Sequence, residues 1–102
     1  MKIYYLFILS SRHHRHLSVG VTADLASGVR AHRALINRRL GKRHVLQKLV
    51  YVETIQNIDE AVEREVRLKR ATRQQLHALV ETVNPGWDRL SLRELVSVGF
   101  SR

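Results

Sequence analysis

A run of seven consecutive apolar residues at positions 3–9, Ile-Tyr-Tyr-Leu-Phe-Ile-Leu, constrains the fold more than any other feature of the chain. Its β-branched and aromatic residues favour a strand, and it is far shorter than the ~20 residues of a membrane-spanning helix. Because no position in the run is polar, a strand formed here must be covered on both faces. The length of 102 residues is enough for one such domain.

Two further segments, 16–22 and 45–54, predict the other strands of the sheet. Residues 16–22 alternate well enough to form a second strand, which we expect to pair with 3–9 as a hairpin. Residues 45–54, rich in Val and Leu, predict a third strand that follows a basic loop over 37–44. The expected sheet is therefore small, three-stranded and mixed.

Three helices are expected from apolar residues at helical spacing and from capping residues at their starts. Asp24, Asn57 and Thr72 are the expected N-caps, the last two in capping boxes with Glu60 and Gln75. The predicted helices cover 25–36, 58–71 and 73–83, and 84–86 ends the last one. The fold class is thus α/β with the order β-β-α-β-α-α. We assign residues 1–90 to this domain and 91–102 to a short C-terminal helix or tail.

The net charge of +9 lies almost entirely in one half of the chain. Residues 11–48 contain nine basic residues and one acid, whereas residues 49–102 contain eight of each. A patch of this sign attracts phosphate backbones, so we expect a nucleic acid as partner, with DNA before RNA; an acidic membrane surface or protein is the alternative. The expected contacts are Arg12, Arg15, Arg30, Arg33, Arg38, Arg39, Lys42 and Arg43.

The composition also excludes several function classes. Without cysteine the chain has no disulfide, no thiol nucleophile and no cysteine-ligated metal. No segment resembles a signal peptide or a membrane span, so we expect a cytoplasmic protein.

Three residues interrupt the apolar stripes of the predicted helices. Glu65 lies in the middle of one stripe, where it either forms an ion pair with Lys69 or holds a divalent metal in a cleft. His32 lies in the middle of another, as a half-buried histidine with a partner or as a catalytic group. Gly28 at the edge of that stripe permits close packing or close approach of a ligand.

Three histidines and two arginines cluster in the expected hairpin turn at 12–16. A metal site there would need neutral imidazoles, which the neighbouring arginines oppose electrostatically. A solvated turn or a phosphate contact is the preferred interpretation.

Six segments in chain order resemble the motifs of the GIY-YIG endonuclease family, specifically its small stand-alone bacterial members. The resemblance extends from about Tyr4 to Leu90. Residues 5–10 and 17–22 resemble the two motif strands, and Asp24-Leu25 together with His32 resembles the first helix. Residues 48–51 resemble the third strand, 61–69 resemble the acidic helix, and 84–87 resemble the closing turn.

The resemblance implies hydrolysis of a phosphodiester bond with one divalent cation, Mg²⁺ or similar. It places the metal on Glu65 and assigns His32 and Asn84 to polar positions of the site. In the family, two strand tyrosines activate or orient water, and an arginine of the first helix stabilises the phosphate charge.

Those three groups are replaced in this chain. The tyrosine positions fall on Phe7 and Ser18, and the arginine position falls on Gly28. Loss of such groups typically lowers rates by about 10²–10⁴ each, so we expect weakened cleavage or a catalytically inactive binding or protein-interaction module. Tyr5 lies two residues from Phe7, on the same strand face, and is the candidate replacement hydroxyl. Arg30 or Arg33 would have to supply the missing charge.

Overall fold

A computed structural model describes residues 2–40 and 46–92 of the chain. Its sheet has three strands, β1 (Tyr4–Ser11), β2 (Leu17–Thr22) and β3 (Leu46–Ile55), in the order β2-β1-β3. The central strand β1 pairs antiparallel with both neighbours, and its pairing with β3 shifts register between Ile8 and Leu9 and between Ser10 and Ser11. The apolar run thus lies inside the sheet, where both of its edges are hydrogen-bonded.

The predicted fold class and element order are confirmed, but the sheet is antiparallel throughout and not mixed. The connection through the first helix brings β3 to the free edge of β1, on the side away from β2. Consequently β3 runs parallel to β2 without being hydrogen-bonded to it, because β1 lies between them.

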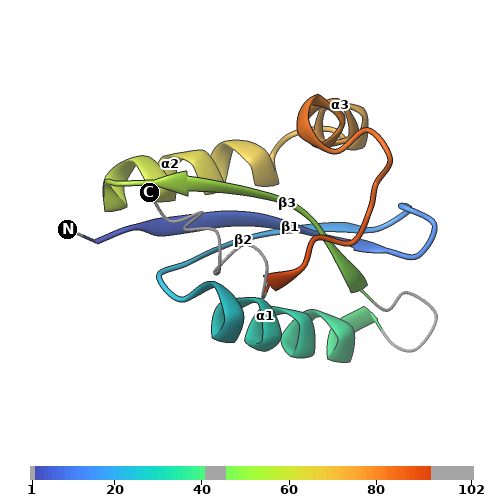
Figure 1. Ribbon diagram of the computed structural model, residues 1–102, viewed down its shortest axis with the longest axis horizontal. Helices are drawn as coiled ribbons and strands as arrows, with labels where there is room; N and C mark the ends of the chain where they lie inside the picture. The colour runs from blue at the N-terminus through green and yellow to red at the C-terminus, as the bar shows by residue number, and fades with distance from the viewer. Residues whose placement is uncertain (1, 41–45, 93–102) are drawn as a thin grey trace.

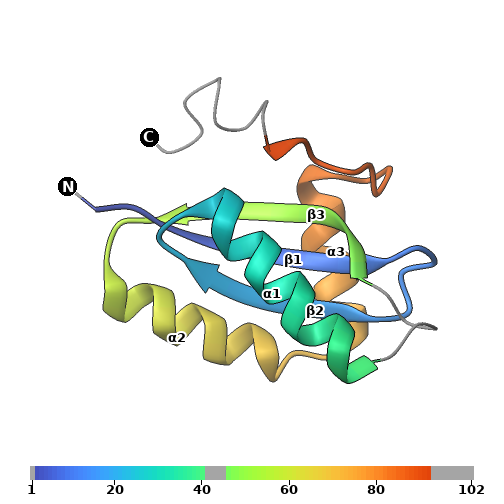
Figure 2. The same ribbon diagram turned by 90° about the horizontal axis from the view of Figure 1, so that it is seen from below.

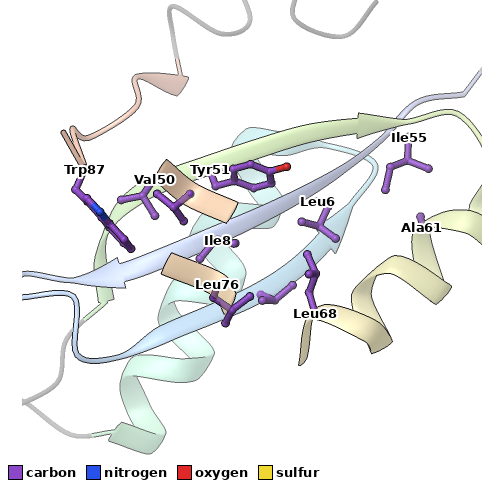
Figure 3. Packing of buried hydrophobic residues seen from close by; sticks show 11 residues of the cluster. Leu6, Ile8, Val50, Tyr51, Ile55, Ala61, Leu68, Leu76 and Trp87 are labelled. Carbon is purple, nitrogen blue, oxygen red and sulfur yellow. The ribbon is translucent and has the colours of Figure 1, made fainter. Parts of the chain in front are cut away.

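Helices cover both faces of the sheet, as the apolar run requires (Figure 1). Helix α1 (Leu25–Leu40) lies on one face, and α2 (Ile58–Lys69) and α3 (Arg73–Val83) lie on the other. The side chains of β1 alternate between these layers: Leu6 and Ile8 pack under α2 and α3, and Phe7 and Leu9 pack under α1. Figure 3 shows the first of the two clusters, in which Leu6 and Ile8 meet the helix residues Ala61, Leu68 and Leu76.

The helix starts follow the predicted caps. Asn57 Oδ1 accepts hydrogen bonds from the backbone N–H groups of Asp59 and Glu60, at 2.7 and 3.2 Å. Thr72 and Gln75 form a complete capping box at the start of α3. Asp24 Oδ1 accepts a hydrogen bond from the Ser27 N–H at 3.2 Å. Local sequence therefore determines where each helix begins.

The end of α1 differs from the prediction, because the helix continues to Leu40 and the basic loop does not begin at Asn37. Arg38 and Arg39 lie in the last turn, where positive side chains interact favourably with the helix dipole. Residues 29–40 contain neither Gly nor Pro, so no helix-breaking residue occurs between Gly28 and Gly41. The rest of the expected loop, and the short helix expected around Glu94, lie outside the described residues. Within the described part of the chain, no helix is long and apolar enough to cross a membrane.

Candidate functional site

A polar pocket of about 200 Å³ opens at the free edge of β2, between the helix layers. Ser18 from β2, His32 from α1 and Lys69 from α2 supply its polar side chains. We call it the β2-edge pocket. Its walls are apolar and consist of Leu17, Val19, Ile36, Leu68 and Leu76. Segments that are distant in the sequence therefore meet here around one edge of the sheet.

His32 and Ser18 form a close contact in this pocket, with Nε2 of His32 2.7 Å from Oγ of Ser18. The edge of the imidazole also meets the Phe7 ring, with centroids 5.3 Å apart and planes at 90°. Burial lowers the pKa of His32 below its ordinary 6.5, and the Lys69 charge lowers it further, against an opposing effect of Glu65. Because this pKa lies below 6.5, the neutral imidazole is the main form at pH 7, and its tautomer decides whether Nε2 or the serine hydroxyl donates the hydrogen bond.

Glu65 lies beside the pocket and is paired with Lys69, with Oε2 3.2 Å from Nζ. The ion-pair interpretation of Glu65 is thus confirmed. The Glu65 side chain is still 26% exposed, and its partner Lys69 lines the pocket, so the carboxylate is not enclosed in the interior. Such a partly exposed pair contributes little to stability.

The residues of this site offer Mg²⁺ few protein ligands. In the described part of the chain, no group of three or more His, Asp or Glu side chains converges. Glu65 supplies one carboxylate, and Lys69 competes for it. One carboxylate together with waters and a substrate phosphate is still a common arrangement for Mg²⁺. The site therefore fits a cation that arrives with a phosphate, and not a resident metal held by protein ligands alone.

Two of the three replaced motif positions, Phe7 and Gly28, are closely packed, whereas Ser18 lines the β2-edge pocket. Phe7 is 1% exposed, and its ring lies where a side chain at Gly20 would be, 2.5 Å from the ideal Cβ position. At Gly28 a Cβ would lie 2.2 Å from Oγ1 of Thr22. Gly28 thus permits close packing of α1 on β2, which was one of its two interpretations.

Two other predicted site residues lie apart from the His32–Ser18 contact. Tyr5 shares the sheet face of Phe7, as expected, and packs half-buried against the apolar cluster under α1. Asn84 is buried at the end of α3, where Nδ2 donates to the carbonyl groups of Val50 and Asp88 at 2.9 and 3.0 Å. Its Oδ1 accepts from the Asp88 N–H at 3.0 Å. These bonds use the Asn84 amide to attach the closing turn to β3, the edge of the sheet opposite β2.

The predicted nucleic-acid contacts are mostly exposed. Arg12 and Arg15 lie in the β1–β2 turn, and Arg30, Arg38 and Arg39 lie on the exposed side of α1. Lys42 and Arg43 fall outside the described residues. Arg33 differs from the others, because it is only partly exposed and its Nε is buried.

The histidines of the β1–β2 turn do not converge with other ligands on a metal site in the described part of the chain. His14 stacks on Trp87, with ring centroids 4.3 Å apart, and its Nε2 accepts a hydrogen bond from Lys48 Nζ at 2.9 Å. His77 of α3 donates from Nε2 to the His14 carbonyl at 3.2 Å. This contact between the turn, β3 and α3 was not predicted, because its members are separated by more than 30 positions in the sequence.

A second unpredicted network connects α2 to β3. Arg64 donates to both carboxylate oxygens of Glu53, at 3.0 and 3.2 Å, and the Tyr51 hydroxyl donates to the same carboxylate at 2.5 Å. Burial and the Glu53 carboxylate raise the pKa of Tyr51 to about 12, so its hydroxyl stays protonated. No single-sequence pattern identifies this pairing.

Comparison of the chain with protein-family models, with curated proteins and with solved structures finds no match.

Proposed function

We propose that this chain is a nucleic-acid-binding protein of the cytoplasm, with DNA as the preferred partner. The observation that supports this most directly is the distribution of ion pairs. The three ion pairs among the described residues join Arg64, Arg67 and Lys69 to glutamates, and all of them involve α2. Among the described residues, the arginines and lysines of positions 11–48 form no ion pair with a carboxylate.

Five unpaired arginines are exposed on two neighbouring elements: Arg12, Arg15, Arg30, Arg38 and Arg39. Both views show the β1–β2 turn and the C-terminal end of α1 at the same end of the molecule (Figure 2). Arg38 and Arg39 lie in that last turn of α1, so the turn and the helix present one basic end. Arginine forks at such a surface match phosphate oxygens, and binding releases counterions from the backbone.

The resemblance to GIY-YIG endonucleases suggests a further activity, metal-dependent hydrolysis of a phosphodiester bond. Its support here is the meeting of Ser18, His32 and Lys69 in one pocket, with Glu65 beside it. When bound by Glu65, Mg²⁺ would supply charge stabilisation to a phosphate. Phe7 has no hydroxyl and Gly28 has no side chain, so we propose that this activity is weak or lost. A catalytically inactive binding or protein-interaction module is the alternative.

Salt dependence of binding tests the main proposal. We expect the logarithm of the affinity for a labelled DNA duplex to fall linearly with the logarithm of salt concentration, with a slope of about −0.9 per phosphate contact. The double variant Arg38→Gln/Arg39→Gln should weaken binding. It should also make the slope less steep by about 1.8, the value for two lost phosphate contacts. The matched control, Arg67→Gln/Arg73→Gln, removes the same charge from α2 and α3 and should change binding much less. Equal losses in both variants, or binding indifferent to salt, would contradict the proposal.

Cleavage of plasmid and branched DNA by the pure protein, with and without Mg²⁺, separates the two candidate functions. Any activity that belongs to this pocket should require Mg²⁺ and disappear in Glu65→Gln, while DNA binding persists. Cleavage that survives this substitution would come from another site or from a contaminant. Binding without cleavage would support the inactive module.

A further inference from the structure

A second pocket, of about 290 Å³, lies on the other flank of α1, toward β3. We call it the Arg33 pocket. Arg33 from α1 and Arg89 from the segment after α3 are its charged residues, and Leu49, Leu90, Ser91 and Leu92 complete its lining. It is thus a separate site from the β2-edge pocket, which lies on the opposite flank of the same helix.

Arg33 is only partly exposed in this pocket. Its Nε is buried and has no hydrogen-bond partner among the residues that the structure describes. Burial lowers the pKa of the Arg33 guanidinium, and the neighbouring Arg89 lowers it further. None of the ion pairs among the described residues reaches either arginine. Two guanidinium groups therefore line one pocket, and neither has an ion-pair partner among the described residues.

The chain holds the two arginines together through backbone and apolar contacts. The Leu90 N–H donates to the Leu49 carbonyl of β3 at 2.8 Å, directly after Arg89. Leu90 and Leu92 then pack against the apolar cluster under α1. Figure 1 shows this segment crossing the β3 edge from the layer of α3 to the layer of α1. The position of Arg89 beside Arg33 is thus built into the fold.

We propose that the Arg33 pocket binds a phosphoryl group that carries two negative charges. Paired guanidinium groups present parallel N–H donors that match phosphate oxygens. A phosphate monoester carries about −1.5 to −2 charges at pH 7 and neutralises both arginines, whereas a backbone diester carries one. The leucine walls are suited to the apolar part of a nucleotide. The group belongs either to the end of a nucleic-acid strand or to a free nucleotide.

Thermal unfolding in phosphate, compared with chloride at equal ionic strength, tests the pocket without any nucleic acid. We expect millimolar inorganic phosphate to raise the Tm of the wild type by about 5 °C. Arg33→Gln should lose this shift. If Arg33→Gln does not fold, Arg89→Gln at an exposed position is the second variant, and it should lose the shift too. Arg30→Gln is the matched control, because it removes the same charge from the exposed side of the same helix. The control should keep the shift. No shift in the wild type, or equal losses in Arg30→Gln and Arg33→Gln, would overturn the proposal.

Two further ligands distinguish the sources of the phosphoryl group. If a strand end is bound, a labelled oligonucleotide with a 5′-phosphate should bind about tenfold more tightly than its 5′-hydroxyl form, and Arg33→Gln should abolish the difference. If a free nucleotide is bound, a nucleoside monophosphate should raise the Tm while the two oligonucleotides bind equally. A phosphate shift in a protein that binds no oligonucleotide would support the pocket and contradict the proposed function.

Discussion

Two adjacent polar residues of α1, His32 and Arg33, lie on opposite flanks of the helix and differ in their hydrogen bonding. His32 faces the β2 edge, where Ser18 Oγ lies 2.7 Å from its Nε2 and Phe7 packs against its ring. Arg33, the next residue, faces the β3 side, where its buried Nε has no partner. Buried polar groups in folded proteins almost always have partners. The difference therefore teaches that the His32 side is satisfied within the fold, whereas the Arg33 side is completed by something from outside.

The largest expected effect comes from the close packing of α1 on β2. Replacing Gly28 with Ala should destabilise the fold by about 3 kcal/mol, because the new Cβ would lie 2.2 Å from Thr22 Oγ1. That hydroxyl is held in place by hydrogen bonds with the backbone of Asp24, so it cannot move aside easily. Denaturant unfolding measures the loss, and Ser27→Ala, one residue earlier and exposed, is the control. A loss of less than about 0.5 kcal/mol would show that this flank has room.

Removing the satisfied histidine should have the next largest effect. His32→Ala should cost about 2 kcal/mol, because it leaves the Ser18 hydroxyl without its partner and opens a space beside Phe7. A double-mutant cycle with Ser18→Ala should give a coupling of about 1 kcal/mol. Strictly additive losses would mean that the contact contributes nothing to stability.

Two histidines, His32 on this flank and His14 in the β1–β2 turn, should make stability depend on pH. Burial lowers the pKa of His32, and burial with the Lys48 charge lowers the pKa of His14. The unfolded chain, with histidine pKa values near 6.5, then binds more protons than the folded chain below that pH. Stability should be constant above about pH 7 and fall as the pH drops through 6.5. Tm values from pH 8 to pH 5 should fall less in His32→Gln, whereas Arg33→Met should follow the wild type.

The smallest expected effect distinguishes the Arg33 side most clearly. In the absence of phosphate, Arg33→Met should leave stability unchanged or raise it by about 0.5–1 kcal/mol, because it removes an unpaired, partly buried charge and keeps an apolar side chain of similar length. Unfolding in chloride buffers measures this directly. A clear loss of stability would mean that the guanidinium already has a favourable environment, and the contrast between the two flanks would fail.

Much of the fold could be predicted because it depends on local chemistry. The apolar run, the caps at Asn57 and Thr72, and the stop after Val83 each act over a few residues. Helix ends are harder to predict: α1 continues through Asn37 because nothing in the sequence interrupts it before Gly41. Strand direction was missed because the edge at which β3 joins the sheet depends on the path of the whole connection.

The candidate site was partly predictable. Helical periodicity identified His32, Gly28 and Glu65 as polar or small residues within apolar stripes, and the structure confirms the Glu65–Lys69 pair. The partner of His32 was not predictable as a contact, because Ser18 lies fourteen positions earlier on another element. The Arg33 pocket had no sequence signal at all, since Arg33 and Arg89 are distant in the chain and both resemble ordinary surface arginines.

Sequence alone indicates that a doubly covered strand with helices on both faces must form, and that one half of the chain carries nearly all of the net positive charge. These properties follow from composition and short-range periodicity, which need no knowledge of distant contacts. Tertiary packing is what distinguishes the exposed arginines from Arg33, whose buried Nε has no partner among the described residues. Burial depends on the elements that pack against a helix flank, and the elements that flank α1 come from opposite edges of the sheet.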